Sequence, residues 1–131
     1  MNILITGSTG VIGKHLIKIL KREYSNSEII GTFYQTKLSN LDDLSNCDNR
    51  HIKYFQYKEI FKFDIKFDQI WHLATYGQPA KFIENWDEVI KLNTSDILYL
   101  SKLLKPNGKF LYASTSELYG PQGSANEDEA P

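Results

Sequence analysis

Three regularly spaced glycines near the N-terminus carry the clearest chemical signal in the sequence. Gly7, Gly10 and Gly13 follow the short apolar run of residues 3–5 and precede a helical pattern of apolar residues. A glycine-rich turn between a strand and a helix presents backbone N–H groups to an anion, and the helix N-terminus adds partial positive charge. The spacing therefore predicts a turn that binds a pyrophosphate; an ordinary glycine-rich turn is the alternative.

The three glycines would serve different purposes in such a turn. Gly7 permits a backbone conformation that a side chain would resist. Gly10 allows the pyrophosphate to approach the backbone closely, and Gly13 allows the helix to pack tightly on the strand. We therefore expect the site to hold a dinucleotide cofactor.

A second group of reactive residue types stands near the other end of the sequence. Ser114, Thr115, Ser116 and Glu117 directly follow an apolar run that is typical of a strand. The hydroxyl groups could hydrogen-bond a substrate alcohol or ketone, and the Glu117 carboxylate could carry a proton. Hydroxyl residues are also common in the turns that end strands, so a purely structural role is the alternative.

The elements that must position these groups alternate between strands and helices. The predicted strands are residues 3–5, 28–34, 52–57, 69–74 and 109–113, and the predicted helices are residues 11–24, 41–44 and 85–104. A turn at residues 105–108 is expected to end the last helix, because proline cannot continue it. Strand–helix–strand crossovers of this kind are right-handed and pair the strands in parallel.

We therefore predict one α/β domain over residues 1–131, with three layers and a doubly wound, Rossmann-type sheet. About five parallel strands in the order 3-2-1-4-5 are expected, with the fold truncated after the fifth. Ligands of an open parallel sheet bind beyond the carboxyl ends of its strands. Residues 7–13, 73–77 and 114–117 should therefore share one rim.

The end of the second predicted strand lacks a residue that NAD sites normally have there. An acidic side chain usually binds the ribose hydroxyls at this point, but the sequence reads Phe33, Tyr34, Gln35, Thr36 and Lys37. The last two could instead bind a 2′-phosphate, which would favour NADP. Alternatively, the loop is simply polar and the ribose is bound by other residues, so both NAD and NADP stay open.

The composition is that of an ordinary globular domain. The 131 residues are 41% hydrophobic, and their net charge of −1 offers no electrostatic attraction to nucleic acid or a membrane surface. Cys47 is the single cysteine, which excludes an internal disulfide and suits a reducing compartment. We see neither a secretory leader nor a run of transmembrane length, and we expect a cytoplasmic protein.

His72 stands inside an apolar run. No second histidine or cysteine lies close enough in sequence to suggest a metal site. We therefore expect a packed core histidine and no bound metal.

Four segments, in the right order and spacing, resemble the extended short-chain dehydrogenases, the NAD-dependent epimerases and dehydratases of nucleotide sugars. They are Met-Asn-Ile-Leu-Ile-Thr-Gly-Ser-Thr-Gly-Val-Ile-Gly (1–13), Asp-Gln-Ile-Trp-His-Leu-Ala (68–74), Leu-Asn-Thr (92–94) and Ser-Thr-Ser-Glu-Leu-Tyr-Gly (114–120). Within the family, the last segment looks most like that of UDP-glucuronate decarboxylases. The similar dTDP-glucose 4,6-dehydratases carry their general acid, an Asp, where Ser116 stands, which argues against dehydration here.

The resemblance implies a role for each matching position. The implied cofactor-binding residues are Gly7, Ser8, Thr9, Gly10, Val11, Ile12, Gly13, Leu73, Ala74, Asn93 and Ser114. Asn93 would hold nearby backbone in place, and the catalytic candidates are Thr115, Ser116 and Glu117. Thr115 would hydrogen-bond the sugar hydroxyl that is oxidised, with assistance from Glu117. The implied reaction is hydride transfer from the C4 hydroxyl of a nucleotide sugar to NAD or NADP, with NAD slightly favoured.

One departure from the family pattern concerns its catalytic base. The family's Tyr-x-x-x-Lys pair should follow on the next helix, where the lysine lowers the pKa of the tyrosine. The one literal match, Tyr54 and Lys58, falls at the third predicted strand and has the wrong geometry. We therefore expect this chain to be inactive alone.

Two other functions stay open: a stand-alone cofactor-binding module without catalysis, and an NADPH-dependent reductase. A truncated sheet would also leave apolar surface or an edge uncovered. We therefore expect a homo-oligomer.

Overall fold

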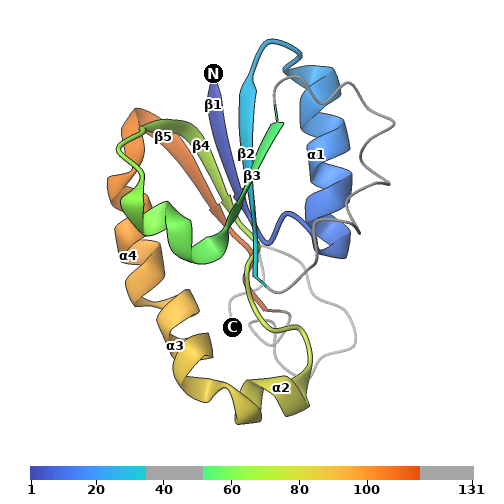
Figure 1. Cartoon of the computed structure of the whole chain (residues 1–131), viewed down its shortest axis with the longest axis vertical. Coiled ribbons are helices and arrows are strands. Elements are labelled where there is room, and N and C mark those ends of the chain that lie inside the picture. The colour runs from blue at the N-terminus through green and yellow to red at the C-terminus, as the bar shows by residue number, and fades with distance from the viewer. Residues whose placement is uncertain (35–51, 116–131) are drawn as a thin grey trace, which may run out of the picture.

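The computed structural model describes residues 1–34 and 52–115, which form a parallel β-sheet covered by helices on both faces (Figure 1). The five strands of the described residues are β1 (Asn2–Thr6), β2 (Glu28–Phe33), β3 (Ile52–Gln56), β4 (Phe67–His72) and β5 (Leu104–Tyr112). Their order in the sheet is β3-β2-β1-β4-β5. The predicted Rossmann-type sheet and its strand order are confirmed.

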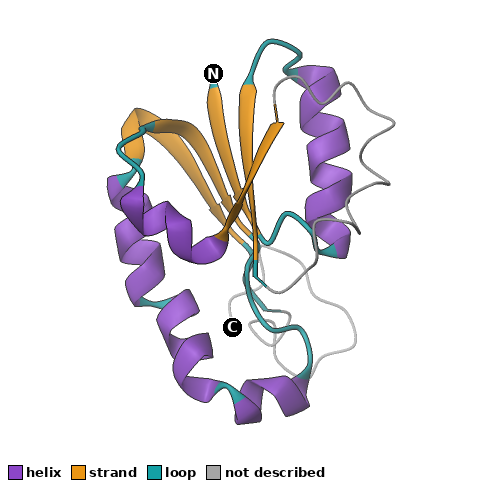
Figure 2. Ribbon diagram, in the orientation of Figure 1, coloured by secondary structure: helices purple, strands orange, loops and turns teal. Residues whose placement is uncertain are grey.

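The helices divide between the two faces of the sheet (Figure 2). They are α1 (Val11–Glu23), the 3₁₀ helix η2 (Tyr57–Lys62), α2 (Pro79–Glu84), α3 (Trp86–Asn93) and α4 (Ser95–Lys102). Successive side chains of a strand point to opposite faces, so Ile3 and Ile5 of β1 pack with Ile17 of α1. Leu4 lies on the opposite face, in one cluster with Leu100 of α4. Each face of β1 is thus buried, as parallel sheets require.

The predicted continuous helix over residues 85–104 is wrong. The segment forms α3 and α4, which are separated by a break at Thr94 with φ −133° and ψ −85°. The Thr94 hydroxyl donates to the Ile90 carbonyl at 2.6 Å, and the Ser95 hydroxyl donates to the Lys91 carbonyl at 3.3 Å. Hydroxyl side chains that bond carbonyls one turn back compete with the regular helix ladder and bend it.

The turn predicted at residues 105–108 is also wrong, because these residues belong to β5. Pairing with β4 runs from Phe67 with Leu104 directly to Gln69 with Lys109, so β5 bulges between the two pairs. Asn107 adopts a left-handed conformation there, with φ +64°. The Lys105 ammonium lies 2.9 Å from the Asp68 carboxylate of β4 and ties the bulge to its neighbour.

Other predicted boundaries move by a few residues. The fourth strand begins at Phe67 and ends at His72, so Leu73 and Ala74 lie just beyond it. The helix predicted near residues 41–44, Cys47, Thr36 and Lys37 lie outside the described residues. In the part of the chain that is described, no helix is long and apolar enough to cross a membrane.

Candidate functional site

A pocket of about 850 Å³ opens where the carboxyl ends of β1, β2, β4 and β5 meet the N-terminus of α1. The glycine turn contributes Gly7, Thr9, Gly10, Val11, Ile12 and Gly13 to its lining. The other strand ends contribute Thr32 to Tyr34, Leu73 to Gln78, Ala113 and Ser114. The three stretches expected to share a rim therefore reach one pocket, as far as the structure describes them.

Two of the three positions in the turn require glycine, one for its backbone conformation and one for its close contacts. Gly7 has φ +67°, a conformation that side chains resist. A Cβ atom on Gly13 would lie 2.5 Å from the Gly7 carbonyl oxygen and 2.7 Å from the Ser8 Cα atom. The first turn of α1 therefore lies directly against the backbone that leaves β1, and its residues Val11, Ile12 and Gly13 line the pocket.

Val11 and Ile12, which the resemblance assigned to the cofactor site, line the pocket. Their side chains are 80% and 67% exposed. They begin α1 on the pocket side of the turn, where no other described element covers them, while Ile17 and Leu20 carry the buried face.

Ser8 anchors the turn to the neighbouring strand and does not line the pocket. Its side chain is fully buried, and its hydroxyl donates to the Thr32 carbonyl oxygen at 2.8 Å. Its backbone N–H donates to the same oxygen at 3.0 Å. The turn is thus fastened to the end of β2.

His72 is almost fully buried and links three elements behind the pocket. Its Nε2 atom lies 3.0 Å from the Leu92 carbonyl oxygen of α3, which can only accept, so Nε2 carries the proton. Its Nδ1 atom, 2.7 Å away from the Thr6 hydroxyl, then accepts from that hydroxyl. The same hydroxyl oxygen accepts from the backbone N–H groups of Leu73 and Ala74, both at 3.2 Å. The network holds the backbone of these two residues at the pocket wall.

We expect the burial of His72 to make the stability of the protein depend on pH. Burial lowers the pKa of His72, against the smaller effects of the Leu92 hydrogen bond and the Asp96 charge. The unfolded chain, with a histidine pKa of about 6.5, therefore takes up the proton first as the pH falls. We expect the free energy of unfolding to decrease below about pH 6.5, measured by urea denaturation.

His72→Phe should remove this part of the slope, although it lowers stability at every pH. His15→Gln is the matched control for the removal of an imidazole, because His15 is exposed on α1. A full slope in His72→Phe would show that other groups cause the pH dependence.

Asn93 lies at the end of α3 and is not among the residues that line the pocket. Its amide nitrogen donates to the Val89 carbonyl at 2.7 Å and to the Thr75 hydroxyl at 3.4 Å. Its amide oxygen accepts from the Tyr112 hydroxyl at 2.7 Å. The side chain thus joins the loop after β4 to the end of β5.

The predicted catalytic group is only partly described. Ser114 lines the pocket, and Thr115 follows it on an exposed position. Ser116 and Glu117 lie outside the described residues. Tyr54 lies in β3 and Lys58 in η2, so this literal Tyr-x-x-x-Lys match spans a strand and a 3₁₀ helix.

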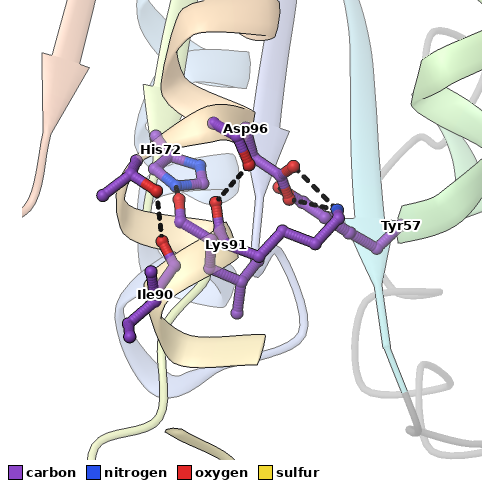
Figure 3. A network of polar contacts seen from close by, with 8 residues as sticks. Tyr57, His72, Ile90, Lys91 and Asp96 are labelled. Carbon is purple, nitrogen blue, oxygen red and sulfur yellow. Dashed lines mark hydrogen bonds and ion pairs between the residues drawn. The ribbon is translucent and has the colours of Figure 1, made fainter. Parts of the chain in front are cut away.

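A buried polar network beside the pocket was missed by the sequence reasoning (Figure 3). The Tyr57 hydroxyl donates to an Asp96 carboxylate oxygen at 2.9 Å, and the Lys91 ammonium lies 2.7 Å from the other oxygen. Asp96 is only 2% exposed. The spacing of the sequence could have revealed this burial, because Asp96 stands four residues from both Leu92 and Leu100 and so lies on the buried stripe of the helical region.

The fold and the rim site define a Rossmann-type α/β protein. The profile of the NAD dependent epimerase/dehydratase family matches residues 3–131. The chain belongs to this family, as the sequence resemblance predicted.

Relatives of known sequence are enzymes of nucleotide sugars. UDP-glucuronic acid decarboxylase 1 of Danio rerio is 31% identical over 119 residues, which cover 90% of this chain and 28% of the relative. A dTDP-D-glucose 4,6-dehydratase of Dictyostelium discoideum is 35% identical over an alignment that covers 90% of this chain and 30% of the relative. The chain thus spans less than a third of the length of these curated relatives.

Solved structures show the same fold. UDP-glucuronic acid 4-epimerase from Bacillus cereus, in complex with UDP-glucuronic acid and NAD, superposes with a TM-score of 0.73 at 23% identity. The match covers all of this chain and 45% of that one. At this identity the likeness concerns the fold alone.

Proposed function

We propose that this chain is the NAD(P)-binding part of a nucleotide-sugar enzyme that acts through oxidation at the sugar C4. The observation that carries the proposal is the pocket itself, which joins the glycine turn at the α1 N-terminus to Ser114 after β5. Family membership supports it, and so do the names of relatives, which include decarboxylases of UDP-glucuronic acid.

The described residues fit a dinucleotide. The pyrophosphate would lie on the glycine turn, where a Cβ at Gly13 would collide with backbone atoms. Dinucleotides bind across the crevice where the strand order reverses, here between β1 and its two neighbours. The nicotinamide half would lie on the β4–β5 side, near Ala74 and Ser114, and the adenosine half on the β2–β3 side, near Tyr34 and Tyr57.

The catalytic roles are those that the family resemblance implies. When bound, the nicotinamide ring supplies the hydride acceptor. Ser114 and Thr115 leave β5 on the nicotinamide side, where Thr115 would hydrogen-bond the C4 hydroxyl and Glu117, with Ser116, would complete the polar group. The sequence has no Tyr-x-x-x-Lys pair on a helix, so we expect the chain alone to bind cofactor without turnover. An NADPH-dependent reductase, or a binding module without catalysis, would use the same pocket.

Cofactor binding to the 131-residue chain is the direct test. We expect NAD to bind with one-to-one stoichiometry in titration calorimetry and to raise the unfolding temperature. At a concentration one hundred times its dissociation constant, NAD should stabilise the fold by about 2.7 kcal/mol. Gly10→Val, which places a branched side chain on the turn, should abolish both effects. Failure of both NAD and NADP to bind would refute the proposal.

A further inference from the structure

Glu88 of α3 is a carboxylate on the wall of the candidate cofactor pocket, which it shares with two tyrosines from other segments. The Tyr76 hydroxyl, from the loop after β4, donates to Glu88 Oε2 at 2.6 Å. A hydrogen bond to Glu88 is the largest cause that raises the pKa of Tyr34, which directly follows β2. All three side chains line the pocket.

The strand geometry places this carboxylate on the adenosine side. Ile30 of β2 belongs to the cluster on the α4 face, and Thr32, two positions further along the strand, shares that face. α3 lies at the same face, beyond the carboxyl ends of the strands (Figure 1). Glu88 and Thr32 thus line the same pocket from α3 and from the end of β2.

Glu88 retains capacity for a ligand. A carboxylate has two oxygens and about four lone-pair sites, and the Tyr76 hydroxyl uses one of them. A second polar group lines the same pocket: Thr32 is fully buried, and its hydroxyl has no hydrogen-bond partner among the described residues. The pocket therefore offers both a carboxylate acceptor from α3 and a buried hydroxyl from β2.

We propose that Glu88, oriented by Tyr76, is the acidic group that binds the hydroxyls of the adenosine ribose, in place of the acid absent from the end of β2. This inference rests on the proposed dinucleotide function and sharpens it. A carboxylate accepts hydrogen bonds from the 2′- and 3′-hydroxyls of NAD and repels the 2′-phosphate of NADP. The chain should therefore select NAD, whatever residues follow Tyr34.

Calorimetric titration of the 131-residue chain with NAD and NADP tests the assignment. Glu88→Gln keeps the shape of the side chain and removes its charge. We expect it to weaken NAD binding about tenfold, the loss of one charge-assisted hydrogen bond, while NADP binding is unchanged or stronger. Tyr76→Phe keeps the charge but releases one contact that orients it, and should weaken NAD binding less.

Glu84→Gln is the matched control. It makes the same change of charge on α2, at an exposed position outside the pocket lining, and should bind both nucleotides as the wild type does. Unfolding temperatures of all variants show that the fold is retained. Unchanged NAD affinity in Glu88→Gln, or an equal loss for NAD and NADP, would refute this assignment and leave the proposed function standing. A wild-type chain that binds neither nucleotide would refute both.

Discussion

Gly13→Ala is expected to lower stability and to weaken cofactor binding at least tenfold, although alanine is the better helix former. In α1, alanine would gain about 1 kcal/mol of helix propensity over glycine. Its Cβ, however, would lie 2.5 Å from the Gly7 carbonyl oxygen and 2.7 Å from the Ser8 Cα atom. Overpacking costs about 1–3 kcal/mol, and these are backbone atoms that no rotamer change can move. We therefore expect a net loss of up to about 2 kcal/mol.

The binding loss has a different cause from the stability loss. To relieve the contact, α1 must shift away from the turn, and its N–H groups then no longer converge on one anion position. For stability the matched control is Gly77→Ala, because a Cβ on Gly77 would have no atom within 4 Å. Urea denaturation of both variants measures the stability loss, and NAD titration of Gly13→Ala against the wild type measures the binding loss. Wild-type stability and affinity in Gly13→Ala would show that the turn does not need a glycine there.

Asp96→Ala is expected to destabilise the protein by about 2–3 kcal/mol. The substitution leaves the buried Tyr57 hydroxyl without its acceptor, which costs about 1–3 kcal/mol, and it opens a small cavity under α4. Relief from burying a charge opposes these effects, but only weakly, because the Lys91 ammonium and the Tyr57 hydroxyl already compensate that charge (Figure 3). The Lys91 side chain is 54% exposed, so in the Asp96→Ala variant its ammonium group can be solvated at little cost.

Companion variants separate these contributions. Asp64→Ala, an exposed aspartate between η2 and β4, should change the free energy of unfolding by less than about 0.5 kcal/mol. Asp96→Asn keeps an acceptor for Tyr57 and should lose less than Asp96→Ala. In a double-mutant cycle, Tyr57→Phe and Asp96→Ala should be less than additive, because they remove the same hydrogen bond. Full additivity in urea denaturation would mean that the two side chains act independently.

The fold was predictable because its signals are local. The apolar runs at β1 and β2 and the amphipathic pattern of α1 each lie within a few residues, and the handedness of crossovers then leaves few topologies. Boundaries that depend on distant partners were not predictable. The break between α3 and α4 at Thr94 accompanies the burial of Asp96 against Tyr57, 39 positions away in the chain.

The sequence likewise predicted one part of the candidate site and not the other. The sequence by itself determined the glycine turn, because the spacing of Gly7, Gly10 and Gly13 reflects contacts within one turn of backbone, and family membership followed from four short motifs. Only the tertiary structure placed Glu88 against Tyr76, with Tyr34 lining the same pocket. The physical reason is that sheet pairing and the packing of α3 bring together side chains from separate segments, and no local pattern of residues records that contact.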